Sequence, residues 1–197
     1  MSTPVTPIRT YGTVAVALHW IVAVCLLCSI VLGLFIGNVE ESAATEQVLA
    51  VHKSFGITIF VLMLARLAWR LTHPAPPLPA TMSAYQRVAA ALTHGLLYVT
   101  LLAMPIAGYI AVSARGRETS YFGLFDVPQW APLSRVLSQN ATTVHVYGQY
   151  LVYALLAAHI GAALYHRLIL KDDVLARMLP RRAPETNGPQ AGDLTRA

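Results

Sequence analysis

Residues 136–166 read VLSQNATTVHVYGQYLVYALLAAHIGAALYH, and this stretch decides the fold. It contains no Asp, Glu, Lys or Arg, and it is long enough to cross a hydrocarbon core about 30 Å thick. It nevertheless carries three histidines, His145, His159 and His166. Ionisable residues are rare at membrane depth and indicate function by default. The stretch therefore predicts a membrane helix that carries a functional site.

His145 and His159 are separated by a spacing that places them on the same side of a helix. They are fourteen residues apart, which at about 100° per residue is four turns less about 40°. At about 1.5 Å per residue they lie about 21 Å apart along the axis. One helix thus presents an imidazole near each side of the bilayer, an arrangement that suits two stacked metal cofactors and not one compact site.

The composition of the whole chain is that of an integral membrane protein. Of its 197 residues, 56% are hydrophobic and 12% are charged, whereas a soluble domain has about 25% charged residues. The net charge of +5 comes from Lys and Arg at helix ends and in the tails, where membrane topology explains them. We therefore expect a lipid bilayer, and no nucleic acid, as the surroundings of this chain.

Four apolar runs predict an all-α, multi-pass four-helix bundle. The expected helices cover about residues 14–37, 52–71, 88–114 and 142–170. An acidic connection at 38–51, a Pro-rich linker at 73–79 and an aromatic-rich connection at 115–139 join them. We expect one four-helix transmembrane domain, residues 1–182, followed by a flexible tail at 183–197.

The distribution of Lys and Arg predicts the orientation of the bundle. One side holds ten of them: Arg9, Arg66, Arg70, Arg87, Arg167, Lys171, Arg177, Arg181, Arg182 and Arg196. The other side holds four: Lys53, Arg115, Arg117 and Arg135. The positive-inside rule then places both termini in the cytoplasm. Arg66 and Arg70, near the end of the second helix, are expected to extend towards the interface.

Histidines on the first two helices match those of the fourth in depth. His19 lies near the cytoplasmic start of the first helix, as His159 lies in the cytoplasmic half of the fourth. His52 and His145 both lie near the outer side. Each pair can clamp one planar iron porphyrin, so we predict all four as haem iron ligands. Zinc would need about four ligands close together. For any single histidine, a hydrogen bond between helices is the alternative.

Small residues near these histidines are expected to leave room for a porphyrin ring. They are Gly56, Gly95, Gly148 and Gly161. Axial ligands and burial would then set the reduction potential.

Short motifs, taken with the histidine spacing, resemble the bacterial di-haem cytochrome b561 family and the related cytochrome b subunits of hydrogenases and formate dehydrogenases. The motifs are His19-Trp20, Val51-His52-Lys53, Leu92-Thr93-His94-Gly95, Ala114-Arg115-Gly116 and Lys171-Asp172. The resemblance covers about residues 10–182. It implies a bundle in the bacterial inner membrane with two non-covalent b haems, and it assigns the ligand roles to the same four histidines.

The resemblance is strongest to short, stand-alone family members, which implies a superoxide oxidase. Such an enzyme takes electrons from superoxide at the periplasmic face and delivers them to ubiquinone near the cytoplasmic haem. The cations Arg115, Arg117 and Lys53 suit this activity, because a basic surface speeds the arrival of an anion. The family's arginine matches Arg115 best. Alternatively, these cations pair with Glu118, Asp126 or lipid phosphate.

A quinone site is expected at the cytoplasmic end. His166 lies two turns beyond His159 and within about 20° of the same face, and an imidazole there can hydrogen-bond a quinone carbonyl and pass protons. The resemblance places quinone contact near His166, and Trp20 and Lys171 can complete the site. His94 can bond a haem propionate, contact quinone or bond a neighbouring helix; we favour the last.

Two other functions remain open on the sequence alone. The first is a non-catalytic electron relay, either the anchor of a larger dehydrogenase or a receiver from a periplasmic cytochrome. The second is a histidine-based transporter without haem.

Overall fold

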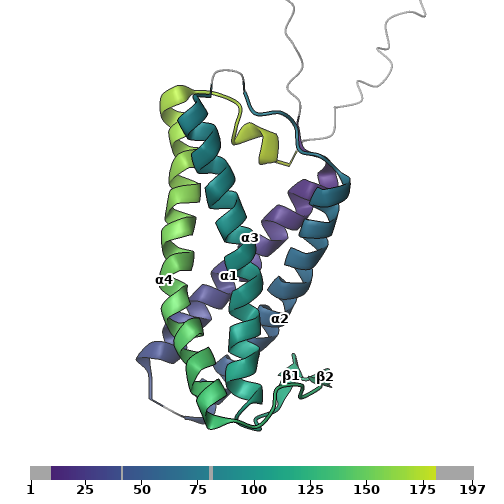
Figure 1. The fold of residues 1–197 in the computed structure, drawn as a ribbon, viewed down its shortest axis with the longest axis vertical. Coiled ribbons are helices and arrows are strands. Elements are labelled where there is room, and N and C mark those ends of the chain that lie inside the picture. The colour runs from purple at the N-terminus through teal and green to yellow at the C-terminus, as the bar shows by residue number, and fades with distance from the viewer. Residues whose placement is uncertain (1–9, 41, 80–81, 181–197) are drawn as a thin grey trace, which may run out of the picture.

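The computed structural model describes residues 10–40, 42–79 and 82–180 (Figure 1). Four long helices run through it: α1 (Thr13–Asn38), α2 (Ala43–Thr72), α3 (Ala84–Ser113) and α4 (Arg135–Tyr165). The last continues as a π-helix, η1 (His166–Leu170), and a short 3-10 turn, η2 (Ala176–Met178), follows. A small antiparallel hairpin, β1 (Thr119–Tyr121) and β2 (Phe125–Val127), lies between α3 and α4.

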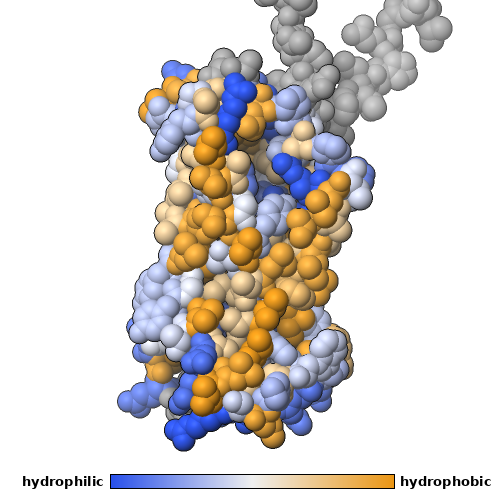
Figure 2. Space-filling model, viewed as in Figure 1, coloured by the Kyte–Doolittle hydropathy of each residue, from blue (hydrophilic) through white to orange (hydrophobic). Residues whose placement is uncertain are grey.

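The surface of the bundle confirms an all-α membrane protein. Each of α1, α2 and α3, and α4 together with η1, is long and apolar enough to cross a membrane. Many large apolar side chains are exposed along them, such as Val24, Leu27 and Val99. Figure 2 shows these apolar residues over the middle of the molecule, with hydrophilic residues gathered towards its two ends. This banding matches a bilayer core between two polar interfaces.

Both ends of the described chain lie at the same end of the bundle (Figure 1). The Tyr11 N–H donates to the Arg177 carbonyl at 3.3 Å. We call this the terminal end, and the opposite one, which carries β1 and β2, the hairpin end. That the described chain begins and ends on the same side agrees with the predicted topology, whereas the cytoplasmic location of the termini stays a prediction.

Three helices begin earlier than the apolar runs predict, because each starts with a serine cap. Ser42 accepts a hydrogen bond from Thr45 N–H, so α2 begins at Ala43 and not near residue 52. Ser83 and Gln86 form a reciprocal capping box at the start of α3. Ser134 caps α4, which starts about two turns before residue 142. The expected connection at 38–51 was therefore wrong, since polar residues there form the first turns of α2.

The hairpin was not predicted, and it is fastened to α2 by one buried serine. Ser54 is fully buried. Its hydroxyl accepts from Phe122 N–H at 2.9 Å and donates to the Ala50 carbonyl at 2.9 Å. Phe122 and Gly123 form the tight turn with φ of 49° and 72°. The hairpin is too short to be stable alone, so its position depends on this contact and on its packing against α2.

The apolar core lies between two levels of histidines. Val22, Ile59, Met63, Leu101 and Val152 form the buried cluster. Val152 is seven residues from both His145 and His159. Close backbone packing joins α1 to α2, α2 to α3 and α3 to α4. In the described part of the chain, α4 makes no comparable backbone packing with α1 or α2, so side chains bridge that separation.

Some predicted features lie outside the described residues. They are Arg9, Arg181, Arg182, Arg196 and the tail at 183–197. The division at residue 182 stays a prediction.

Substituting Ser54→Ala should destabilise the protein and loosen the hairpin. The change leaves the partly buried Phe122 N–H without its acceptor, and the loss of such a hydrogen bond costs about 1 kcal/mol. Thr143→Ala is the matched control, because that exposed hydroxyl bonds only the Gln139 carbonyl of its own helix; its effect should stay within about 0.5 kcal/mol. Thermal unfolding in detergent and hydrogen exchange at the Phe122 amide measure both effects. Unchanged exchange at Phe122 would contradict the role of Ser54.

Candidate functional site

Two histidine pairs bridge α4 to α1 and α2, the helices with which it shares no close backbone packing among the described residues. At the hairpin end, the rings of His52 on α2 and His145 on α4 have centroids 6.0 Å apart. At the terminal end, His19 on α1 and His159 on α4 also lie 6.0 Å apart. A metal bound to one nitrogen of each ring, at about 2 Å, would hold the two centroids roughly 6 Å apart. The structure thus brings together the same pairs that depth predicts.

The hairpin-end pair is oriented as metal ligands usually are. His52 Nδ1 lies 3.0 Å from the Ser29 carbonyl, and His145 Nδ1 lies 2.9 Å from the Met104 carbonyl. A carbonyl only accepts, so each Nδ1 carries the proton and each Nε2 keeps its lone pair. Anchoring the second ring nitrogen in this way fixes the tautomer of a ligand histidine. Both imidazoles are therefore suited to bind iron through Nε2.

Two glycines that the sequence analysis did not single out set the position of these rings. A Cβ on Gly108 would lie 2.9 Å from His145 Cε1, and one on Gly33 would lie 3.2 Å from His52 Cε1. The expectation for Gly148 was wrong, because Met104 Sδ fills that space at 2.6 Å from its Cβ position. A Cβ on Gly56, Gly95 or Gly161 would meet nothing within 4 Å.

The terminal-end pair has a different environment. The ring of His94 on α3 lies 5.2 Å from that of His159, so a third histidine joins this level. Arg66 does not extend to the interface as expected. Its Nη1 lies 2.7 Å from His19 Nδ1, and its Nε donates to the Tyr98 hydroxyl at 3.2 Å. A cationic group therefore lies directly against one of the predicted ligands.

A small cavity of about 80 Å³ opens beside this cluster. Arg66, Arg70, His73 and His94 line it, together with the aromatic rings of Trp69 and Tyr98. His73 is exposed, as expected, and it stacks on Trp69 with the ring centroids 3.7 Å apart. Basic and aromatic groups together suit an anion that carries a flat apolar body.

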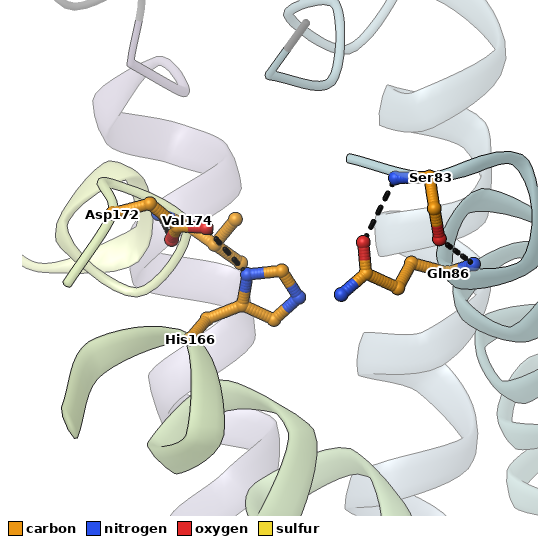
Figure 3. Close-up of polar contacts among 5 residues, drawn as sticks. All are labelled: Ser83, Gln86, His166, Asp172 and Val174. Atoms are coloured by element: carbon orange, nitrogen blue, oxygen red, sulfur yellow. Dashed lines mark hydrogen bonds and ion pairs between the residues drawn. The ribbon is translucent and has the colours of Figure 1, made fainter. Parts of the chain in front are cut away.

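A second cluster at the terminal end is built by the π-helix that follows α4. His166 is only 6% exposed, and its Nδ1 lies 2.6 Å from Asp172 Oδ2. The other oxygen of Asp172 accepts from Val174 N–H at 3.0 Å, which fixes the carboxylate. Figure 3 shows the opposite edge of the imidazole turned towards Gln86 at the start of α3. The carboxylate thus orients the ring and leaves Nε2 available for a ligand.

Trp20 and Lys171 lie near this end but take other roles in the local structure. The Trp20 indole N–H donates to the Met178 carbonyl at 2.6 Å, so it is already engaged. Lys171 ends the π-helix in a left-handed conformation with φ 54° and is exposed. The turn at Lys171 is what brings Asp172 back onto His166. Asp172 and Gln86 had no assigned role in the sequence, although a motif at 171–172 pointed to the first.

The predicted outer cations all lie at the hairpin end. Arg117 forms an ion pair with Glu46 at 3.3 Å, and both side chains are more than half exposed. Lys53 Nζ donates to the Glu118 carbonyl at 3.0 Å, which fixes the ammonium without neutralising it. Arg115 is exposed, and its side chain has no ion pair with the described residues. Of the predicted alternatives, neither Glu118 nor Asp126 pairs its carboxylate with these cations in the described chain.

Comparison with known proteins supports the resemblance seen in the sequence. A family model described as prokaryotic cytochrome b561 matches residues 10–181. Cytochrome b561 homolog 2 of Escherichia coli K12 is 34% identical over 94% of this chain and 98% of its own length. Cytochrome b561 homolog 1 of the same organism is 31% identical over 87% and 98%. The "Probable superoxide oxidase CybB" of Yersinia pestis is 26% identical over 88% and 98%.

Substituting Gly108→Ala should destabilise the site, because the new Cβ would overlap the His145 ring. Overpacking of this kind costs about 1–3 kcal/mol. Gly56→Ala is the matched control: its Cβ meets open space, and replacing a helical glycine by alanine gains roughly 0.5–1 kcal/mol. The midpoint of thermal unfolding in detergent should thus fall for Gly108→Ala and rise for Gly56→Ala. Equal changes in the unfolding midpoint would show that the His145 ring does not pack against Gly108.

Proposed function

Because this chain belongs to the prokaryotic cytochrome b561 family, we propose that it carries two b haems across the bacterial inner membrane, oxidises superoxide and reduces ubiquinone. The family implies haem b and electron transfer in a membrane. The number of haems, the donor and the acceptor are our assignments. The observation that carries them is the presence of two imidazole pairs, each 6.0 Å across, at opposite ends of one apolar core.

The residues present fit a haem at each level. At the hairpin end, His52 and His145 hold their Nδ1 atoms on carbonyls, which leaves both Nε2 atoms free, and their rings lie 6.0 Å apart between α2 and α4. At the terminal end, His19 and His159 span the separation between α1 and α4. Haem bound at these positions supplies one-electron chemistry. The protein holds the rings of each pair apart, anchors the second nitrogens of His52 and His145, and places an apolar core between the two levels.

Superoxide oxidation is assigned to the hairpin end. Arg115 is the cation we assign to attracting the anion, because Glu46 already neutralises Arg117 in part. Lys53 follows the proposed ligand His52 in the sequence and adds a positive charge at this end. The Glu118 carbonyl holds its ammonium group in place. Arg117 remains a contributor as one wall of a polar pocket of about 170 Å³ at this end. Local positive charge raises the arrival rate of an anion in a salt-dependent manner.

Ubiquinone reduction is assigned to the terminal end. Two superoxide anions give up one electron each and leave as O₂, and one ubiquinone takes the two electrons and two protons. His166 Nε2 is the group we assign to a quinone carbonyl, with Asp172 holding the ring and Gln86 facing it (Figure 3). Trp20 would contribute its ring and not its engaged N–H. Lys171, exposed at the turn, can supply protons from water.

An electron relay without superoxide chemistry is the second candidate. The observation in its favour is that Glu46, Glu118 and Asp126 share the hairpin end with the cations. A face of mixed charge also suits a protein donor. The two functions differ in whether superoxide alone can reduce the haems.

Replacing His145 by alanine should remove the haem at the hairpin end and leave the other in place. The two sites share α4 but no ligand, so the loss should be confined to one of two b haems. Haem content per protein and the reduced difference spectrum measure this. His73→Ala, which changes a histidine outside both pairs, should keep the full haem content. Loss of the terminal-end haem alone from His145→Ala would show that the ligands are paired differently.

Superoxide should reduce the purified, oxidised protein within the mixing time of a rapid experiment, and ubiquinol should accumulate. The haem spectrum is followed after superoxide is generated enzymatically, and superoxide dismutase is the control that abolishes the signal. Arg115→Gln should slow the reduction several-fold at low salt, and the difference should shrink as salt rises. Haems that stay oxidised under superoxide would favour the relay.

A further inference from the structure

One contact at the terminal end determines the protonation of a predicted iron ligand. Arg66 Nη1 lies 2.7 Å from His19 Nδ1. A guanidinium group has donors and no acceptor. His19 Nδ1 must therefore be the acceptor in this contact, so in the neutral ring the proton resides on Nε2. This is the opposite tautomer to that of His52 and His145, whose Nδ1 atoms face carbonyls.

Iron ligation through Nε2 of His19 is incompatible with that contact. The ligating nitrogen needs its lone pair, so the proton must move to Nδ1, which then donates. Two donors cannot hydrogen-bond each other. When Nε2 of His19 binds iron, Arg66 must therefore turn to another acceptor. Its Nε contact to the Tyr98 hydroxyl keeps the guanidinium near the ring level while it does so.

The surroundings of Arg66 offer no protein carboxylate. No Asp or Glu occurs among the described residues that line the adjoining cavity. Arg70 adds a second positive charge to this lining, and His94 adds an imidazole ring. A half-buried guanidinium without an anion is costly, because its charge is only partly solvated. A ligand that brings an anionic group into this cavity would therefore find in Arg66 a cation that no carboxylate among the lining residues neutralises.

We propose that Arg66 binds a carboxylate of the terminal-end porphyrin, leaving His19 when the iron is ligated. This rests on the proposed haem pair of His19 and His159. Arg is suited to the task, since its planar fork binds a carboxylate through two parallel hydrogen bonds. Arg70 lines the same cavity and lies one helical turn away, so it supports the same anion. Arg66 is thus a binding residue that also places positive charge beside the haem.

The test is a redox titration of the haem-loaded protein in detergent, followed at the b-haem bands. A nearby positive charge favours the reduced haem, so Arg66→Gln should lower the terminal-end potential. We expect about a tenfold change in the reduction equilibrium, equal to about 59 mV for one electron. Arg66→Lys should recover part of it. Arg167→Gln, which removes an exposed arginine at the same end, is the charge-matched control and should leave both potentials in place.

A second arm identifies the anion without a mutation. The full-length wild-type chain is loaded with haem dimethyl ester, whose carboxylates are masked. The terminal-end potential should fall, and Arg66→Gln should then add little further change. If Arg66→Gln lowers the terminal-end potential but the ester does not, the proposal is overturned, because Arg66 would then be paired with another anion such as a lipid phosphate. If neither Arg66→Gln nor the ester lowers the terminal-end potential, the proposal is overturned as well.

The failure of the underlying haem assignment has a different signature. If His159→Ala retains both b haems, the ligand pair itself is wrong, and the role of Arg66 fails with it. If His159→Ala loses one haem while Arg66→Gln leaves the remaining potentials untouched, only the role of Arg66 is wrong.

Discussion

The separation of α4 from α1 and α2 is the constraint on which the rest of the structure depends. Close backbone packing runs from α1 through α2 and α3 to α4 and does not close the ring in the described chain. A membrane bundle has no hydrophobic drive to close such a gap, because lipid is as apolar as its own side chains. Side chains bridge the gap instead: imidazole pairs at two levels, each with ring centroids 6.0 Å apart, and the apolar cluster between them. The fourteen-residue spacing on α4 then fixes the distance between the levels, and the core around Val152 separates them.

The two levels differ in how the second ring nitrogen is held. At the hairpin end, helix carbonyls at Ser29 and Met104 accept from Nδ1. Those acceptors belong to the backbone, so the site is formed by helix packing alone, and Gly33 and Gly108 let the backbone approach. At the terminal end, an arginine occupies the equivalent position on His19. The predicted hairpin-end ligands are therefore already in the tautomer that could bind iron through Nε2, whereas His19 would have to change its hydrogen-bond partner.

The sequence predicted the four helices, and it predicted which histidines lie at the same depth and form pairs. These predictions were possible because helical periodicity and charge distribution extend over many residues. Helix starts could not be read from hydropathy, since Ser42, Ser83 and Ser134 cap polar turns that extend beyond the apolar runs. The hairpin depends on one serine contact across 68 residues. The positions of Gly108 and Arg66 depend on which faces meet in three dimensions, and a periodic pattern does not say which glycine faces a ring or which arginine turns inward.

The asymmetry between the two ends bears on the direction of electron flow. On the proposed assignment, neutral carbonyls anchor the hairpin-end ligands, and the cations at that end lie towards the surface. Arg66, with Arg70 in the same cavity, instead places positive charge directly against the ring of His19 at the terminal end. Net charge is one of the properties that set a haem potential, and positive charge stabilises the reduced form. Electrons that enter at the hairpin end would then move downhill towards the terminal end. On the same assignment, the ring of His166, held by Asp172, would take part in proton uptake there. The same arginine would thus help to hold the cofactor and to direct its chemistry.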